Sequence, residues 1–135
     1  MPEELPGGCL CGAVRYRMTA SPAVVTFCHC TACRRGSGAP AVAWATVRPE
    51  EFSLTRGALA FVASSPGVRR GFCGRCGTPI TYQADFLGGY LDVTTGSLDD
   101  PDLLPPQMHI WTTHRLEWMR GVLSHLPEHP EFPAG

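Results

Sequence analysis

All seven cysteines of the chain fall into three tight groups, and this clustering constrains the fold more than any other feature. The groups are Cys9-Leu10-Cys11, Cys28-His29-Cys30-Thr31-Ala32-Cys33 and Cys73-Gly74-Arg75-Cys76. Cysteines that only pack in a core would be scattered, whereas closely spaced thiolates converge on one metal ion. Gly12 follows the first group and Gly77 the third, and glycine lets the backbone turn tightly around an ion. The spacing therefore predicts metal binding.

Coordination numbers indicate how the seven thiolates are shared. A structural zinc takes four ligands, so the two outer pairs predict a closed site at Cys9, Cys11, Cys73 and Cys76. Zinc bound there would supply much of the folding free energy of a small glycine-rich domain, on the order of 10 kcal/mol or more. Reduced core cysteines or a redox dithiol are the alternative interpretation of these two pairs.

The central group leaves three thiolates, and spacing alone allows several interpretations. Cys28, Cys30 and Cys33 fit a labile or catalytic zinc that keeps one coordination position open. They also fit a redox trio in which Cys30 and Cys33 form the dithiol. In a third interpretation, His29 or a distant histidine completes a second structural site. An iron–sulfur cluster is disfavoured because it usually needs four cysteines of its own.

Composition and patterning predict a mainly β, antiparallel fold with short helices only. Gly and Pro number 15 and 13 among 135 residues, which favours short strands and many turns. Arg56-Gly57 is expected to turn a hairpin, Ser97 to cap a helical turn, and Trp44 and Trp118 to lie in the core. The segments expected to form strands are 13–18, 24–27, 41–47, 52–54, 59–62, 68–72, 80–82, 90–95 and 109–113.

Charge and hydropathy argue against several functional classes. The formal net charge is −1 and all 11 basic residues are arginine, which argues against binding to nucleic-acid phosphates. No apolar run reaches the roughly 18–20 residues of a membrane span. The start Met1-Pro2-Glu3-Glu4-Leu5 lacks the basic and apolar stretches of a secretory signal. We therefore expect a cytoplasmic protein with reduced cysteines and a single domain over 1–135, ordered from about residue 5 to about residue 127.

Several motifs together resemble the glutathione-dependent formaldehyde-activating enzyme family, which includes centromere-protein-V-like proteins. The resemblance implies a β-tent fold, in which zinc joins β-sheets. It also implies two zinc ions per chain, a structural one at the two outer cysteine pairs and a second one at the central group. The motifs cover the chain from about residue 7 to residue 127 in the family's order: Gly7–Tyr16, Cys28–Arg35, Ser64–Gly67, Phe72–Thr78, Gly96–Pro101 and His109–Trp111.

The resemblance further implies an activity, the combination of formaldehyde with glutathione to give S-hydroxymethylglutathione. A thiol bound at the open position of the second zinc would be deprotonated, and would attack a small aldehyde or leave from carbon in the lyase direction. Arg34 and Arg35 follow the central group and are candidates to hold a substrate carboxylate, with a solvated surface pair as the alternative. His109 and Trp111 are expected to alternate on a strand and line a pocket, or else to pack ordinarily.

Three functional classes remain open at this stage. The first is a zinc enzyme of the carbon–sulfur lyase class that acts on a small thiol such as glutathione. The second is a zinc-stabilised binding or structural module without catalysis. The third is thiol–disulfide redox chemistry at the central group. Nothing in the sequence sets the oligomeric state.

Overall fold

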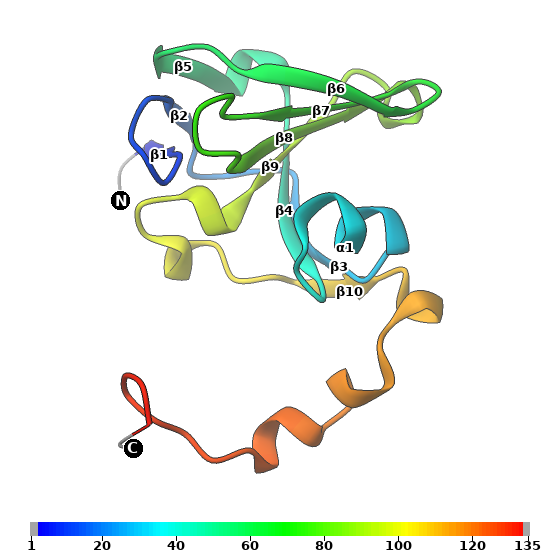
Figure 1. Ribbon diagram of the computed structural model, residues 1–135. Coiled ribbons are helices and arrows are strands. Elements are labelled where there is room, and N and C mark those ends of the chain that lie inside the picture. The colour runs from blue at the N-terminus through cyan, green and yellow to red at the C-terminus, as the bar shows by residue number, and fades with distance from the viewer. Residues whose placement is uncertain (1–2, 134–135) are drawn as a thin grey trace.

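The computed structural model describes residues 3–133, and within them the chain is mainly β, as the sequence predicts (Figure 1). Met1, Pro2, Ala134 and Gly135, which belong to the expected domain, lie outside the described residues.

A three-stranded antiparallel sheet has the order β1-β2-β5, with β1 at Glu4–Gly8, β2 at Arg15–Thr19 and β5 at Phe52–Arg56. A seven-stranded sheet has the order β10-β3-β4-β9-β8-β7-β6. Its strands are β3 (Val24–Cys28), β4 (Val42–Val47), β6 (Ala60–Ser65), β7 (Val68–Phe72), β8 (Pro79–Ala84), β9 (Leu91–Thr94) and β10 (Met108–Ile110).

The helical segments of the described chain are short, which confirms that prediction. One α-helix, α1 (Thr31–Ser37), follows β3 and ends at Gly38, whose left-handed φ of 75° lets its N–H reach the Arg34 carbonyl at 2.8 Å. The other helical segments are single 3₁₀ turns: η1 (Pro49–Glu51), η2 (Asp85–Leu87), η3 (Thr95–Ser97), η4 (Pro101–Leu103), η5 (Thr112–His114), η6 (Glu117–Met119) and η7 (Val122–His125).

The buried side chains form two clusters, and each contains cysteines. The alternation of β2 buries Tyr16 and Met18 in the larger cluster while Arg17 faces solvent, because successive side chains of a strand point to opposite faces. Trp44 forms the smaller cluster with Cys28 and Cys33, as expected of a core tryptophan. The larger cluster comprises Leu5, Cys9, Val14, Tyr16, Met18, Val25, Ala45, Val47, Cys73, Ile80, Leu91, Val93 and Leu98.

The turn after β9 docks against the three-stranded sheet. The Ser97 hydroxyl lies 2.7 Å from the hydroxyl of Tyr16, so Ser97 does not cap a helical turn as expected. Asp99 pairs with Arg15 through two hydrogen bonds of 2.9 and 2.6 Å. The sequence predicts neither contact, because the partners lie more than 80 residues away.

The expected hairpin at Arg56-Gly57 is wrong. Strand β5 pairs with β2, whereas β6 pairs with β7 in the other sheet, so the chain crosses between sheets at this point. Gly57 has φ 73° and lies directly against the backbone carbonyl of Ala13. Glycine is therefore needed here for a close approach of two backbone segments, and not for a hairpin turn.

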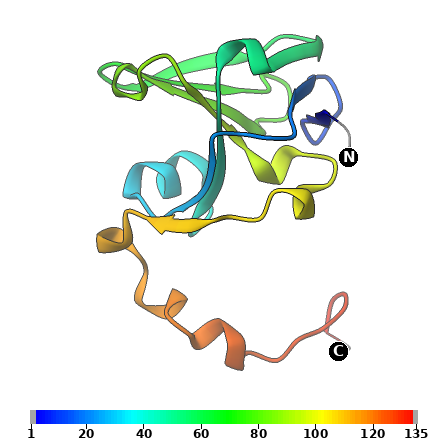
Figure 2. The ribbon, with the colours of Figure 1, turned by 180° about the vertical axis from the view of Figure 1, so that it is seen from behind.

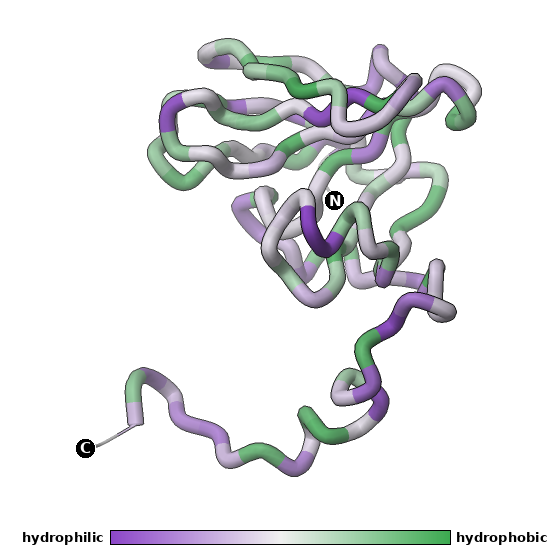
Figure 3. Tube along the Cα trace, turned by 45° about the vertical axis from the view of Figure 1, so that its right-hand side comes forward, coloured by the Kyte–Doolittle hydropathy of each residue, from purple (hydrophilic) through white to green (hydrophobic). Residues whose placement is uncertain are grey.

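The last strand and the segment after it depart from expectation. Strand β10 runs parallel to β3, whereas the other strand pairs described are antiparallel. Beyond β10 the chain runs away from both sheets, with apolar and polar residues alternating along it (Figures 2 and 3). Trp118 is 44% exposed on this arm and does not belong to the core, so that prediction is wrong. Within residues 3–133 we find no helix with the length and apolar character that a bilayer span requires.

Candidate metal centre and adjoining cavity

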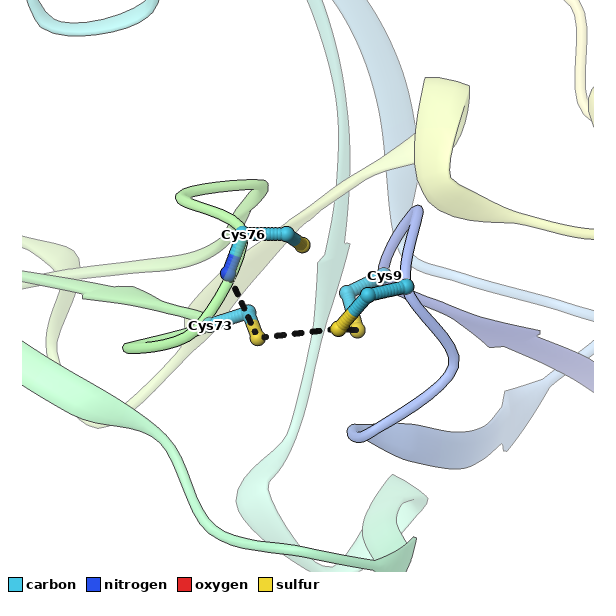
Figure 4. Close-up of side chains that lie close together, drawn as sticks. Cys9, Cys73 and Cys76 are labelled. Carbon is cyan, nitrogen blue, oxygen red and sulfur yellow. Dashed lines mark hydrogen bonds between the residues drawn. The ribbon is translucent and has the colours of Figure 1, made fainter.

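The four outer cysteines meet between the two sheets. Cys9 and Cys11 lie in the loop from β1 to β2, and Cys73 and Cys76 lie in the loop from β7 to β8 (Figure 4). All four sulfur atoms lie within 4.8 Å of one another, and they are the one such group of three or more ligands in the described chain. The sequence predicted this grouping from the spacing of the two pairs.

The separations of the sulfur atoms fit a tetrahedral zinc. Zinc–sulfur bonds of about 2.3 Å place neighbouring sulfurs about 3.8 Å apart in a regular tetrahedron. The sulfurs of Cys9 and Cys11 are 3.6 Å apart, and those of Cys11 and Cys73 are 3.8 Å apart. A disulfide would bring two sulfurs to about 2.05 Å, so these are separate thiols. The donor set and its geometry therefore suit a structural zinc.

Both loops are built in the same way around their cysteines. The N–H of Gly12 bonds the Cys9 carbonyl at 3.2 Å, and the N–H of Gly77 bonds the Cys73 carbonyl at 2.8 Å. These two glycines have φ of 80° and 85°, in the left-handed region that other residues rarely adopt. Backbone N–H groups also point at sulfur, as from Val14 to Cys9 at 3.2 Å. The loops thus turn tightly and present donors that stabilise thiolate charge.

A threonine connects the two cysteine loops. The Thr78 hydroxyl lies 3.2 Å from the Cys76 sulfur and accepts a hydrogen bond of 3.1 Å from the Leu10 N–H. As a donor to sulfur, this hydroxyl is the main cause that lowers the pKa of Cys76 to about 5. Burial acts to raise the pKa of Cys9, but hydrogen bonds from the N–H of Val14 and from the thiols of Cys11 and Cys73 outweigh it, so the pKa is lowered. Metal binding requires thiolates, which these contacts favour at Cys76 and Cys9. At Cys11 a backbone hydrogen bond from Ala13 acts in the same direction, but burial and the neighbouring sulfurs outweigh it and raise the pKa to about 11.

The central cysteines are carried by the junction of β3 and α1. Cys28 ends β3, Cys30 precedes the first helical residue, and Cys33 lies inside α1. The sulfurs of Cys28 and Cys33 are 3.6 Å apart in the smaller core cluster. The three do not form a group in which every sulfur lies within 4.8 Å of the other two. A hydrogen bond from the Cys28 thiol lowers the pKa of Cys33 to about 6, while the pKa of Cys28 itself is raised.

His29 is buried next to the central cysteines and contacts His109. The Nε2 atom of His29 lies 2.9 Å from Nδ1 of His109, and the backbone N–H of His29 bonds the Ile110 carbonyl at 3.0 Å. Burial lowers the pKa of His29, and the nearby charges of Arg115 and His109 act in the same direction. These contacts attach β10 to the chain at the central cysteine group.

A cavity of about 730 Å³ adjoins both cysteine regions and is called here the central cavity. Its walls come from the end of α1, from β4, β6, β7 and β8, and from the turn at 94–97. Gly77 and Thr78 of the outer site line one side, and Gly36 and Ser37 of α1 line another. The volume falls within the range of about 300–1,000 Å³ that is typical of small-molecule sites.

The other candidate residues lie outside this lining. Arg34 is partly buried and Arg35 is exposed, and both lie on α1. Trp111 follows the end of β10 with a left-handed φ of 56°, is 57% exposed, and stacks on His114. His109 and Trp111 therefore do not alternate along one strand.

One arginine of the cavity was missed by sequence reasoning. Arg70 of β7 lines the central cavity and lies beside Cys33, where it contributes to the lowered pKa of that thiol. It follows Arg69 directly, and the two side chains point to opposite faces because β7 alternates. The adjacent pair of arginines before the third cysteine group was the only available signal, and it does not indicate which of the two faces the cavity.

The fold and the four-cysteine site define a class of protein, a mainly β protein whose two sheets meet at a thiolate site suited to metal. The chain belongs to the family described as glutathione-dependent formaldehyde-activating enzyme, whose model matches residues 4–114. This confirms the resemblance stated from the sequence.

Other comparisons are consistent with this fold. A crystal structure of a protein from Rhodobacter sphaeroides is similar to this chain, with a TM-score of 0.64 and 25% sequence identity. The similarity covers 78% of this chain and 99% of that chain. None of the curated proteins is significantly similar to this chain in sequence.

Proposed function

We propose that this protein is an enzyme of thiol-adduct chemistry that joins a small thiol, such as glutathione, to formaldehyde or a related small aldehyde. The observation that carries the proposal is the central cavity, which adjoins the helix bearing Cys33 and is large enough for a small peptide. The family to which the chain belongs supports the choice of thiol and aldehyde. The seven cysteines are free thiols, which supports a reducing compartment such as the cytoplasm.

We further propose that the outer quartet holds a structural zinc and that Cys28, Cys30 and Cys33 hold a second one. Two of these three sulfurs already lie 3.6 Å apart, and the sulfur of Cys30 must move toward them to complete the set. When bound, a three-thiolate zinc supplies an open position at which an incoming thiol is held as a thiolate. Cys28 and Cys33 are buried against Trp44 in the smaller cluster.

The proposed reaction is balanced without any oxidant. The substrate sulfur attacks the aldehyde carbon, a carbon–sulfur bond forms, and the carbonyl π electrons move to oxygen. The thiol proton ends on that oxygen, so the product is an S-hydroxymethyl thioether. In the reverse direction the carbon–sulfur bond breaks and the thiol is released, which is the lyase reaction. The part of the protein in both directions is to hold the thiol in the cavity beside the central cysteines.

The test is to mix zinc-loaded protein with glutathione and formaldehyde and to follow S-hydroxymethylglutathione by NMR against a protein-free control. We expect the adduct to reach equilibrium faster with protein, and Cys30→Ser to remove the acceleration while the protein stays folded. Arg35→Gln is the matched control, because Arg35 is exposed on the same helix and lies outside the cavity lining. Equal rates with and without wild-type protein would contradict the proposed function.

One observation favours a second function, a zinc-stabilised binding or structural module without catalysis. The sulfur of Cys30 does not converge with those of Cys28 and Cys33, as a preformed three-thiolate site would require. For such a module, loss of the central thiols would leave the rate of adduct formation unchanged and would alter only stability. The net charge of −1 argues against nucleic acid as the partner of such a module.

A further inference from the structure

Arg70 is the one charged residue among the described residues that line the central cavity. The remaining lining is apolar or carries hydroxyl groups, as at Thr78 and Thr81. A lone guanidinium on such a wall favours a ligand that carries an anion, because its fork of N–H donors matches a carboxylate. The cavity thus has the character of a site for a small, mostly uncharged molecule with one acidic group.

The guanidinium of Arg70 is held in a fixed position by three elements. Its Nε donates a hydrogen bond of 3.0 Å to the Ser64 hydroxyl of β6, and its Cζ lies 4.8 Å from the ring centre of Tyr82 of β8. On the side of α1, a methyl group added at Gly36 would lie 3.2 Å from the Arg70 Cζ, so helix and guanidinium are in close contact. An arginine fixed in this way loses little conformational entropy when it binds.

The terminal nitrogens of Arg70 remain available for a ligand. Within residues 3–133, the ion pairs involve Arg15, Arg48 and Arg120, and none involves Arg70. Its Nε is used by Ser64, so a carboxylate would be held at the terminal NH₂ groups, which also donate toward the sulfur of Cys33. Arg70 also lies beside Cys33, so a molecule held at Arg70 lies next to the central cysteine group.

We propose that Arg70 is the carboxylate-binding residue of the central cavity and that it positions a carboxylate-bearing thiol with its sulfur next to the central cysteines. This inference rests on the proposed function, because it assigns the part of the substrate that the cavity recognises. It also replaces Arg34 and Arg35 as the arginines expected to hold the substrate, since neither lines the cavity. Arg70 is thus a positioning residue that selects acidic thiols over neutral ones.

The experiment measures binding separately from chemistry. The probe is S-methylglutathione, whose sulfur is blocked and which keeps both carboxylates, titrated into zinc-loaded protein by ligand-observed NMR. We expect Arg70→Met to weaken binding by about tenfold or more, because hydrogen bonds between charged groups are lost. Arg69→Met is the matched control, because Arg69 lies over the Phe61 ring at 3.6 Å and outside the cavity lining, and it should bind as the wild type does.

A second probe tests the chemistry that Arg70 recognises. The diethyl ester of S-methylglutathione lacks both carboxylates, and we expect it to bind the wild type and Arg70→Met equally weakly. The proposal is overturned if the wild type does not bind S-methylglutathione, if the ester binds the wild type as tightly as the acid does, or if Arg70→Met binds the acid as the wild type does. If Arg70→Met does not fold, Ser64→Ala replaces it as the test variant. We expect this variant to bind S-methylglutathione severalfold more weakly than the wild type, and unchanged affinity would overturn the proposal.

The outcomes also separate this inference from the proposed function. Binding of S-methylglutathione that depends on Arg70, without any acceleration of adduct formation, would support the carboxylate site and contradict the catalytic function. Acceleration of adduct formation with an unchanged KM for glutathione in Arg70→Met would support the catalytic function and overturn the role of Arg70.

Discussion

The sulfur atoms of Cys11 and Cys73 lie 3.8 Å apart although 62 residues separate them in the chain. One belongs to a loop of the three-stranded sheet and the other to a loop of the seven-stranded sheet. An ion held by the quartet would therefore join the two sheets. The free energy of its binding would then contribute directly to folding.

Removal of metal from the quartet should destabilise the whole protein. We expect Cys73→Ser to lower Tm by at least about 10 °C, because a structural zinc contributes many times the ~1 kcal/mol that shifts Tm by a few degrees. Differential scanning calorimetry measures the shift. Cys30→Ser is the control and should melt near the wild type. Equal Tm values for wild type and Cys73→Ser would contradict a structural role.

Metal content should distinguish the two sites. We expect two zinc ions per wild-type chain and one per chain in Cys30→Ser, measured by mass spectrometry of the native protein. Two ions in this variant would exclude Cys30 as a necessary ligand. No ion would show that the two groups do not bind independently.

The contact between Tyr16 and Ser97 should contribute measurably to stability. Tyr16 is 1% exposed, so Tyr16→Phe removes a buried hydroxyl partner of Ser97 at little change in volume. We expect a loss of about 1 kcal/mol in the free energy of unfolding by urea. A double-mutant cycle with Ser97→Ala tests the pairing, and additive effects would show that the two hydroxyls do not interact.

The ion pair of Arg15 and Asp99 should make stability depend on pH in the acid range. Arg15 lowers the pKa of Asp99, so the paired carboxylate stabilises the fold above its unfolded pKa of about 4, and this contribution is lost as pH falls through the lower folded value. The side chains are 33% and 47% exposed, so solvent screening limits the effect to about 0.5 kcal/mol.

Chemical denaturation at several pH values tests this pair. Asp99→Asn should be less stable than wild type at pH 7, and the difference should disappear at low pH and shrink at high salt. Asp100→Asn is the control, because Asp100 follows directly and none of the ion pairs of the described chain includes it. A difference between Asp99→Asn and wild type that is the same at every pH would contradict the assignment.

Gly57→Ala should destabilise the protein more than an otherwise similar substitution. Gly57 has φ 73° and lies against the Ala13 carbonyl, so a methyl group is strained and also collides with backbone. Gly88→Ala is the matched control, with φ 62° and no atom within 4 Å of the added methyl. By urea unfolding, we expect the free energy of unfolding to fall by about 1 kcal/mol in the control and by at least about 2 kcal/mol in Gly57→Ala. Equal losses would mean that the backbone segments at Gly57 and Ala13 move apart at little energetic cost.

Much of the local structure was predictable because its causes are local. The alternation around Tyr16 identified β2, and the spacing of Cys73 and Cys76 before Gly77 identified the turn whose sulfurs join the quartet. The partner of β5 was not predictable in this way. Hairpin rules describe neighbours in sequence, whereas β5 pairs with β2, which lies more than 30 residues upstream.

The cavity illustrates the same limit for the candidate site. Arg34 and Arg35 are candidates from the sequence because they follow the central cysteines, yet neither belongs to the lining of the central cavity. Arg70 enters that lining from β7, through the packing of β7 against β8 and of its side chain against α1. The position of Arg70 beside the cavity arises from tertiary structure. The local sequence at Arg69 and Arg70 gives no reason to predict which of the two lines the cavity.

The parallel pairing of β10 with β3 has a consequence for the order in which the protein is assembled during translation. All four sulfurs of the outer site are present once residue 76 has left the ribosome, whereas the backbone bond that ties His29 to Ile110 needs a segment made 34 residues later. Because synthesis runs from the N-terminus, the four outer sulfurs can come together while the central cysteines still lack their edge strand. A ribosome stalled before codon 108 would then carry a polypeptide that has the complete outer quartet but lacks the edge strand beside the central cysteines.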